Sequence, residues 1–238
     1  MRRWSWLVIS SALVCLVGCF GQDSYNKRLA STLERLERSR RVEKNLMPAP
    51  DEKKYKDLAI YVRPPKDEAQ AKAGQLPAGE GQFEVDSSFL DKQSAALHLL
   101  ARVKLPKKAP TKGAAPTPTP APRGEFTRDV LNVLISVYGP IEGLATPKFV
   151  DESKRGNRFK RLVVAANDKE VKLYTYKQDN YEVALVFVYD SKLRGALSSK
   201  IDLCLETFAT GAKATQNYNS GGQPDEEDAS GGGAPPPM

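Results

Sequence analysis

Alternating apolar and polar positions predict three consecutive strands in the second half of the chain. The predicted strands are Phe159–Ala166, Val171–Lys177 and Tyr181–Tyr189. Asn167-Asp168 and Asp179-Asn180 separate them, and both dipeptides favour the tight turns of β-hairpins. The third strand is apolar on both faces except at Glu182, which predicts a central position with cover on both sides. We therefore expect an antiparallel meander over residues 159–189.

Two helices are predicted to flank this meander. Phe126 as a hydrophobic staple and Thr127 as N-cap begin the first helix, which ends at Gly139-Pro140. A loop follows to about residue 157, and the second helix covers about residues 192–209. Its apolar side carries Leu197, Ile201, Cys204, Leu205 and Phe208. This order of elements predicts an α+β fold in which helices cover one face of an antiparallel sheet.

The first half of the chain contains weaker strand patterns. Short strands are predicted at residues 58–63, 83–85 and 97–105, with a loop over residues 66–82. A helix over residues 89–101 is the alternative to the last strand. The economical arrangement adds the strands at 58–63 and 97–105 to the sheet of the meander, because a separate small subdomain, the alternative, would bury little apolar surface. The α+β domain is thus expected over residues 50–210.

Low-complexity segments interrupt and follow this domain. Residues 106–123 hold six prolines among Ala, Thr and Lys, a composition that favours an extended, solvated chain. We expect this proline-rich tract to be an insertion in the domain. Residues 211–238 carry few apolar side chains and include an acidic stretch at 225–228. That composition predicts a disordered C-terminal tail.

Residues 22–45 are predicted to form a helix ahead of the domain. Its narrow apolar stripe consists of Tyr25, Leu29, Leu33 and Leu36, and its other faces are strongly cationic. The stripe lacks the Trp or Phe of a helix that lies in a membrane interface. The pattern therefore favours a solvated stalk over a membrane-surface or partner-binding helix.

The N-terminus has the layout of a secretory signal peptide. Arg2 and Arg3 precede a short apolar run that ends in small residues. The run is too short for a stable membrane span. At its end stands Leu16-Val17-Gly18-Cys19, which resembles the lipobox of bacterial lipoproteins. The resemblance covers this leader alone and implies nothing about the fold of the rest.

The lipoprotein resemblance implies that residues 1–18 are a signal peptide, cleaved after Gly18. A diacylglyceryl group would join the Cys19 thiol, and a further acyl chain such as palmitate would join the new amino terminus. Two or more chains hold a protein firmly at a membrane, at ~0.8 kcal/mol per buried methylene. Residues 19–49 would then comprise the lipid anchor and the cationic helix. Phe20 stands where an aspartate retains such proteins in the inner membrane, which favours the outer membrane.

The net charge and the numbers of His and Cys argue against nucleic-acid binding, a metal site and a disulfide framework. The formal net charge is +7, and removal of residues 1–18 leaves 34 basic and 29 acidic residues, a net charge of +5. This excess is too small to indicate nucleic-acid binding. One His and three Cys make a metal site or a disulfide framework improbable, so no cofactor is expected. Cys204 alone would keep its thiol, and its place on an apolar helix side predicts burial and low reactivity.

One basic cluster stands out as a candidate binding site for anions. It consists of Lys154, Arg155, Arg158, Lys160 and Arg161. Five cations within eight residues would suit phospholipid headgroups, lipopolysaccharide or an acidic wall polymer. A solvated turn and strand end is the alternative, and it is the commoner role of such a run.

Catalytic signals are weak. His98, the single histidine, lies in an alternating apolar segment and is predicted to be a core or surface residue. The sequence contains no nucleophile-elbow, HExxH or CxxC motif. The neighbouring carboxylates at Asp151-Glu152 and Asp225–Glu227 fall in the expected loop and tail, with no sign of a cleft to hold them apart. We therefore expect a protein that is not an enzyme.

Three functional hypotheses remain. The first is a non-enzymatic, lipid-anchored protein of the cell envelope that binds a partner protein or supports an assembly. The second is a module that binds an anionic wall or lipid polymer through the basic cluster. The third is an enzyme with an unrecognised site that uses carboxylates and tyrosines such as Tyr174 and Tyr176. The sequence leaves the ligand, the oligomeric state and the membrane leaflet open.

Overall fold

The structure is a computed structural model of the chain. It describes residues 4–66, 72–74, 82–90, 95–104, 124–139, 147–166 and 168–221, with side chains from Ser24 onward except at residues 72–74 and 166. The chain divides into two compact units, residues 1–44 with 223–238, and residues 45–222. The proline-rich tract at 106–123 and the acidic stretch at 225–228 lie outside the described residues. Their predicted disorder therefore stays a prediction.

A long helix, α1 (Trp4–Asn45), accounts for the described part of the first unit. It confirms the predicted helix at 22–45 and extends it toward the N-terminus. Residue 19 lies within this helix, but the structure does not describe the side chain of Cys19. Within the described residues, no helix combines the length and the apolar character needed to cross a membrane.

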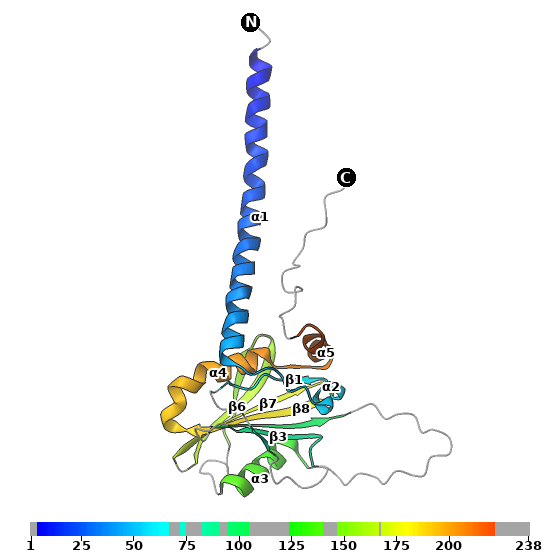
Figure 1. Cartoon of the computed structure of the whole chain (residues 1–238), viewed down its shortest axis with the longest axis vertical. Coiled ribbons are helices and arrows are strands. Elements are labelled where there is room, and N and C mark those ends of the chain that lie inside the picture. The colour runs from blue at the N-terminus through cyan, green and yellow to red at the C-terminus, as the bar shows by residue number, and fades with distance from the viewer. Residues whose placement is uncertain are drawn as a thin grey trace, which may run out of the picture. The chain divides into compact units, whose positions relative to one another are not determined.

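The second unit is built on a seven-stranded antiparallel sheet in the order β2-β3-β4-β8-β7-β6-β5 (Figure 1). The strands are β2 (Lys72–Gly74), β3 (Val85–Leu90), β4 (Ala96–Val103), β5 (Val150–Lys154), β6 (Asn157–Ala166), β7 (Lys169–Gln178) and β8 (Tyr181–Asp190). The meander β6-β7-β8 confirms the predicted strands, and β8 takes the predicted central position. The α+β fold class is confirmed.

Helices cover both faces of this sheet, not one face as predicted. Side chains of a strand alternate between the two faces. On β8, Ala184, Val186 and Val188 therefore face α3 (Phe126–Tyr138), with which they share an apolar cluster. The alternate β8 positions face α4 (Arg194–Thr207), which follows a short 3₁₀ turn, η1 (Ser191–Leu193). Figure 1 shows α3 and α4 on opposite sides of the sheet.

The predicted apolar side of the last helix is confirmed. Leu197, Ile201, Cys204, Leu205 and Phe208 are all buried. Phe208 packs against Phe159 and Tyr176, with ring centroids 5.8 and 5.1 Å apart. Burial raises the pKa of the Cys204 thiol, which keeps it protonated and poorly nucleophilic.

The start of α3 differs from the prediction. Thr127 lies inside the helix, and the N-cap is Glu125, whose side chain makes no capping hydrogen bond. Instead, Arg102 of β4 donates a hydrogen bond to the Gly124 carbonyl at 3.0 Å and forms an ion pair with Asp129 in the first turn. A tertiary contact therefore fixes this helix end, and local capping chemistry could not reveal it. The helix ends at Gly139, φ 80°, as predicted.

The predicted loop before residue 157 contains the edge strand β5. It pairs with β6 through a two-residue turn, Arg155-Gly156, whose φ angles are 47° and 81°. Positive φ at both turn positions matches the twist of a hairpin. The sequence Val150–Lys154 is mostly charged because this strand is exposed at the sheet edge, and it therefore lacks the apolar alternation of a buried strand.

The first half of the chain joins the domain in two ways. The strand predicted at 97–105 is β4 and lies in the main sheet, so the helical alternative at 89–101 is wrong. The short strand predicted at 83–85 begins at Val85 and continues as β3. The predicted loop at 66–82 contains β2.

The segment predicted as a strand at 58–63 does not extend the main sheet. There β1 (Ile60–Tyr61) pairs with β9 (Ala209–Thr210) in a separate two-stranded sheet. It follows α2 (Lys53–Asp57).

A helix also occupies part of the predicted C-terminal tail. It is α5 (Gly211–Asn219), so predicted disorder from residue 211 is wrong for this stretch. Tyr218 donates to the carbonyls of Ile60 and Pro50 at 3.0 and 3.3 Å. Tertiary hydrogen bonds thus hold a helix whose own sequence has little apolar character.

Candidate functional site

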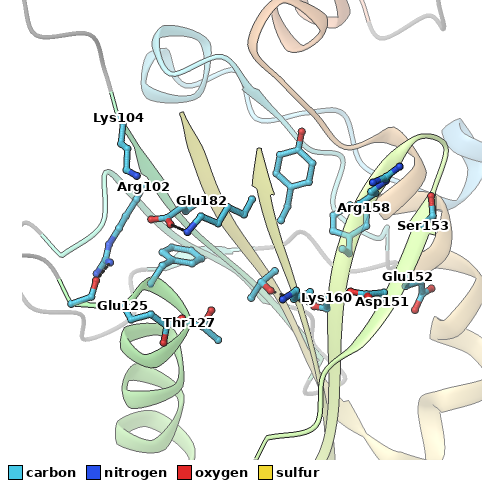
Figure 2. Close-up of a pocket in the computed structure, with 16 residues that line it drawn as sticks. Arg102, Lys104, Glu125, Thr127, Asp151, Glu152, Ser153, Arg158, Lys160 and Glu182 are labelled. Atoms are coloured by element: carbon cyan, nitrogen blue, oxygen red, sulfur yellow. Dashed lines mark hydrogen bonds and ion pairs between the residues drawn. The ribbon is translucent and has the colours of Figure 1, made fainter. Parts of the chain in front are cut away.

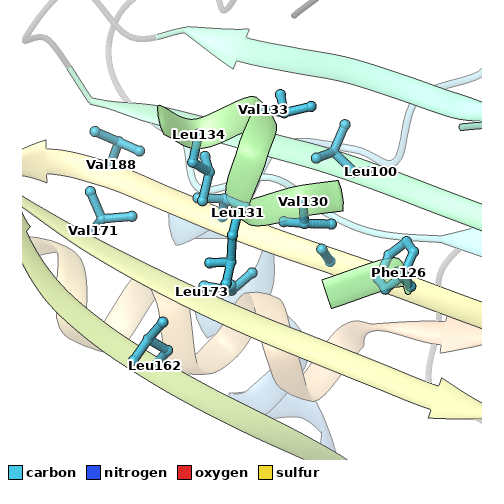
Figure 3. Packing of buried hydrophobic residues seen from close by; sticks show 12 residues of the cluster. Leu100, Phe126, Val130, Leu131, Val133, Leu134, Leu162, Val171, Leu173 and Val188 are labelled. Carbon is cyan, nitrogen blue, oxygen red and sulfur yellow. The ribbon is translucent and has the colours of Figure 1, made fainter. Parts of the chain in front are cut away.

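A cleft of about 980 Å³ opens on the α3 side of the sheet, beside the N-terminal end of that helix (Figure 2). Phe126 lines the cleft and also belongs to the apolar cluster under α3, which Figure 3 shows, so the two adjoin. Strands β4 to β8 supply its floor, and Glu125 and Thr127 of the α3 start form one border. The helix therefore leaves part of the sheet face uncovered, and that part is polar.

Strand register gathers polar side chains from distant parts of the sequence in this cleft. In one row, Lys177 of β7 pairs with Glu182 of β8, and Glu182 pairs with Arg102 of β4. In the next row, Asp151 of β5 pairs with Lys160 of β6, and Lys160 pairs with Thr175 of β7. Residues paired across strands point to the same face of a sheet. The cleft floor therefore holds two short polar rows, one on β7, β8 and β4 and the other on β5, β6 and β7. On β8 the second row continues as Ala184 of the apolar cluster.

Two of the cations in this surface already have acidic partners. Arg102 is only 4% exposed; besides the ion pair with Asp129, it donates to the carbonyl of Gln82 at 2.9 Å. Its guanidinium lies 5.1 and 5.5 Å from the ring centroids of Phe83 and Phe126. Lys177 forms an ion pair with Glu182 at 2.9 Å. Arg102 thus fastens α3 to the sheet, and Lys177 is neutralised by its neighbour.

Arg158 and Lys160 are the open cations of the cleft. Both are exposed, and they lie two residues apart on the same face of β6. No ion pair joins either of them to another described residue, although Asp151 is the strand partner of Lys160. Lys104, just after β4, is a further exposed cation at the other side of the cleft, as Figure 2 shows.

The structure divides the predicted basic cluster between the two sheet faces. Lys154 and Arg161 lie on the α4 side, where each forms an ion pair with Glu152, at 3.2 and 2.9 Å. Asp202 of α4 lies 2.9 Å from the Lys154 ammonium, and this hydrogen bond raises the pKa of Lys154. Arg155 is exposed in the hairpin turn. The five cations therefore do not form one anion-binding patch.

His98 serves the fold and does not line the cleft. It is buried between Ser88, whose Oγ lies 2.7 Å from its Nδ1, and Tyr138, whose hydroxyl contacts its Nε2. Burial lowers the pKa of His98 to about 4, so the ring is neutral at physiological pH. The chain Ser88–His98–Tyr138 ties the end of α3 to β3 and β4.

The tyrosines considered for catalysis are also part of the packed interior. Tyr174 and Tyr176 are buried beside Phe159, at centroid distances of 6.2 and 5.8 Å. Burial raises the pKa of Tyr174 to about 12, and the neighbouring Glu152 charge adds to this effect. The Tyr176 hydroxyl is engaged with Gln178 at 2.5 Å. In the described part of the chain, no group of three His, Cys, Asp or Glu is placed to hold a metal ion.

Glu170 of β7 is a buried carboxylate on the α4 side of the sheet. Tyr189 donates to it at 2.7 Å, Arg194 at 2.6 Å, and the Lys172 ammonium lies 3.6 Å away. Burial alone would raise the pKa of Glu170, but these hydrogen bonds and charges hold it below its usual value. The network links the start of α4 to β7 and β8.

Comparisons with known proteins identify no family. No protein-family model matches the chain, and no curated protein matches it. Among solved structures, it is similar to the solution structure of cyanobacterial PsbP (CyanoP) from Synechocystis sp. PCC 6803. The two are 10% identical, and the match covers 70% of this chain and 93% of that chain with a TM-score of 0.42. At that score the likeness carries no argument about function.

Proposed function

We propose that this chain is a non-enzymatic, lipid-anchored protein of the cell envelope that binds a partner protein through the cleft beside α3. The observation that carries the proposal is the pair of exposed cations, Arg158 and Lys160, on a part of the sheet that α3 leaves uncovered. Apolar packing under α3 covers the neighbouring part of this sheet face, whereas the two cations stay open to a ligand at its border.

The anchor part of the proposal rests on the leader. The sequence Leu16-Val17-Gly18-Cys19 resembles a lipobox in the expected place behind a cationic and apolar start. Acylation of Cys19 would give the mature protein enough buried methylenes for stable attachment to a membrane. Phe20 favours the outer membrane.

The non-enzymatic part is supported by where the reactive groups lie. His98 and Cys204 are buried away from the cleft, at 3% and 0% exposure. The cleft acid Glu182 pairs with Lys177. Two others, Glu125 and Asp151, are exposed and lack the enclosed surroundings of a general acid or base. General acid–base or nucleophilic chemistry needs such groups within reach of a substrate. The cleft chemistry instead suits reversible recognition.

An anionic wall or lipid polymer is the second candidate ligand, and the exposure of Arg158 and Lys160 favours it. Exposed Glu125 and Asp151 border the same cleft and oppose it. A polymer with a negative charge on every repeat would bring charges against both carboxylates. A protein segment with isolated acidic side chains avoids that repulsion.

Mass analysis of the native protein, together with crosslinking in intact cells, tests the proposal. We expect a chain that begins at an acylated Cys19, sediments with membranes and crosslinks to a specific neighbouring protein. A Cys19→Ser variant should lose the acyl mass and leave the membrane fraction. A native chain without acyl groups that still carries residues 1–18 would contradict the anchor, and absence of any specific protein neighbour would contradict the binding role.

A further inference from the structure

The shape of the cleft restricts what its occupant can be. Its floor crosses five neighbouring strands from β4 to β5. At ~4.8 Å between strands, this floor is about 19 Å wide. An extended polypeptide advances ~3.3 Å per residue, so about six residues would cross it. A short extended segment therefore matches the width of the cleft.

The two polar rows place cations on both sides of such a segment. Lys160 belongs to the row of Asp151 and Thr175. Arg158, which pairs with Ser153, lies two residues from Lys160 on the same face, toward the row of Lys177 and Glu182. A segment that lies between the rows would have Arg158 on one side and Lys160 on the other. Two long cationic side chains about 7 Å apart along β6 can close on one carboxylate.

Lys104 supplies a second cationic point on the opposite side of the cleft. It follows β4, and its backbone nitrogen donates to the Asn180 carbonyl at 2.8 Å, which fixes its place at that edge. Three strand spacings separate β4 from β6, or about 14 Å. Lys104 lies two residues beyond Arg102, and its long side chain can reach back toward the row of Arg102. The distance across the strands then corresponds to about four residues of an extended peptide.

The remaining lining groups suit a peptide backbone. The carboxylates of Glu125 and Asp151 can accept its N–H groups, and the hydroxyls of Thr127, Thr175 and Ser153 can donate or accept. Ion pairs to other described residues occupy neither Glu125 nor Asp151. Mixed charge of this kind favours an occupant with few, well-separated negative charges over a polyanion.

We infer that the cleft binds an extended segment of a partner protein with two acidic side chains about four residues apart, one held between Arg158 and Lys160 and the other at Lys104. This inference rests on the proposed function, because it gives the chemistry of the partner that the proposal requires. It assigns no role to Lys154 or Arg161, which already have partners on the α4 side.

A selection from displayed random ten-residue peptides, with the full-length chain in detergent micelles as bait, tests the inference. We expect the enriched peptides to share two acidic residues about four positions apart. Labelled versions should bind with an affinity that falls roughly tenfold or more in Arg158→Glu and in Lys160→Glu. Replacement of either peptide acid by its amide should weaken binding in the same way.

Arg155→Glu is the matched control, because it makes the same charge change at an exposed residue of the same hairpin outside the cleft lining. Its affinity for the peptides should stay near that of the parent. Enriched peptides without acidic pairs, or unaffected by the Arg158 and Lys160 changes, would overturn the inference. Phosphatidylglycerol vesicles or dextran sulfate that bind through these two residues, with no peptide enriched, would also overturn it.

This result is separable from the test of the proposed function. A protein neighbour found in cells together with cleft-independent peptides would leave the anchored binding role intact and remove only the assignment of the cleft. If no protein neighbour is found in cells and no peptide binds the cleft, the proposed function is contradicted as well.

Discussion

The two faces of the β5–β6 hairpin carry similar charges but differ in what surrounds them. On the α4 side, Lys154 and Arg161 meet Glu152 and Asp202 at 2.9 to 3.2 Å. On the α3 side, Arg158 and Lys160 face an open cleft. The same run of basic residues is therefore divided by strand alternation into a half that holds the fold and a half that is open to a ligand.

The largest loss of stability is expected on replacement of Arg102, which lies between the cleft and the apolar cluster under α3. Arg102→Ala would leave Asp129 without its cation and the carbonyls of Gln82 and Gly124 without their donor. Loss of one partner of a buried ion pair costs about 3–5 kcal/mol. Urea denaturation of the full chain should show a decrease of this size in the free energy of unfolding. A decrease below ~1 kcal/mol would mean that Arg102 does not fasten α3.

Protonation of His98 at low pH should give the next largest loss of stability. Its folded-state pKa is about 4, below its ordinary value of 6.5, so between these pH values the unfolded chain binds a proton that the folded chain does not. The free energy of unfolding should therefore fall by roughly 3 kcal/mol as the pH drops from 6.5 to 4.

Denaturation at a series of pH values checks this slope. The chain has one histidine, so His98→Gln should remove most of the slope above pH 5, where carboxylates contribute little. An unchanged slope in the variant would show that His98 is already accessible to protons in the folded protein.

A smaller difference in stability is expected between replacement of Glu152 on the α4 side of β5 and replacement of Asp151 on its cleft side. Glu152→Gln removes the carboxylate charge that pairs with Lys154 and Arg161. It should cost about 1 kcal/mol, because these partly exposed pairs are screened by solvent. Asp151→Asn, one residue away on the cleft side, should change stability by less than ~0.5 kcal/mol. The difference should shrink in high salt. Equal costs for the two changes would contradict the division of the hairpin.

The smallest effect on stability is expected from the open cations. Arg158→Gln and Lys160→Gln should each change the free energy of unfolding by less than ~0.5 kcal/mol, because neither side chain has an acidic partner among the described residues. Thermal denaturation measures this directly. A loss of more than ~1 kcal/mol in either variant would place that cation in the fold and not in a binding surface.

The parts of the fold that sequence could predict are those set by local pattern. The meander follows from period-two alternation and from turn residues such as Asp179, φ 50°. The apolar side of α4 follows from helical spacing, which also placed Cys204 in the core. In each case the signal lies within the element itself.

The features that were predicted wrongly depend on contacts with distant residues. The strand predicted at 58–63 pairs with β9 and not with the main sheet, and α5 is held by Tyr218 hydrogen bonds to Ile60 and Pro50. Neither partner can be read from the segment alone. The edge strand β5 is mostly charged and gives no apolar signal.

Only part of the candidate site, the two cations of β6, could be predicted from the sequence. Period-two alternation along β6 already separates Arg158 and Lys160 from Arg161. The neutralisation of Lys154 by Asp202 was not predictable, because it requires the position of α4 over that edge of the sheet. Lys104 could not be assigned to the site before the pairing of β4 with β8 was known.

Site-specific photocrosslinking in intact cells tests the central claim most directly. A photoreactive residue at Thr175 would stand on the cleft floor, and one at Val163 would stand exposed on the opposite face of the same sheet. We predict a discrete protein adduct from position 175, lost in the Arg158→Glu, Lys160→Glu double variant, and no such adduct from position 163. Equal adducts from both positions, or an adduct from position 175 that survives both charge reversals, would contradict the account.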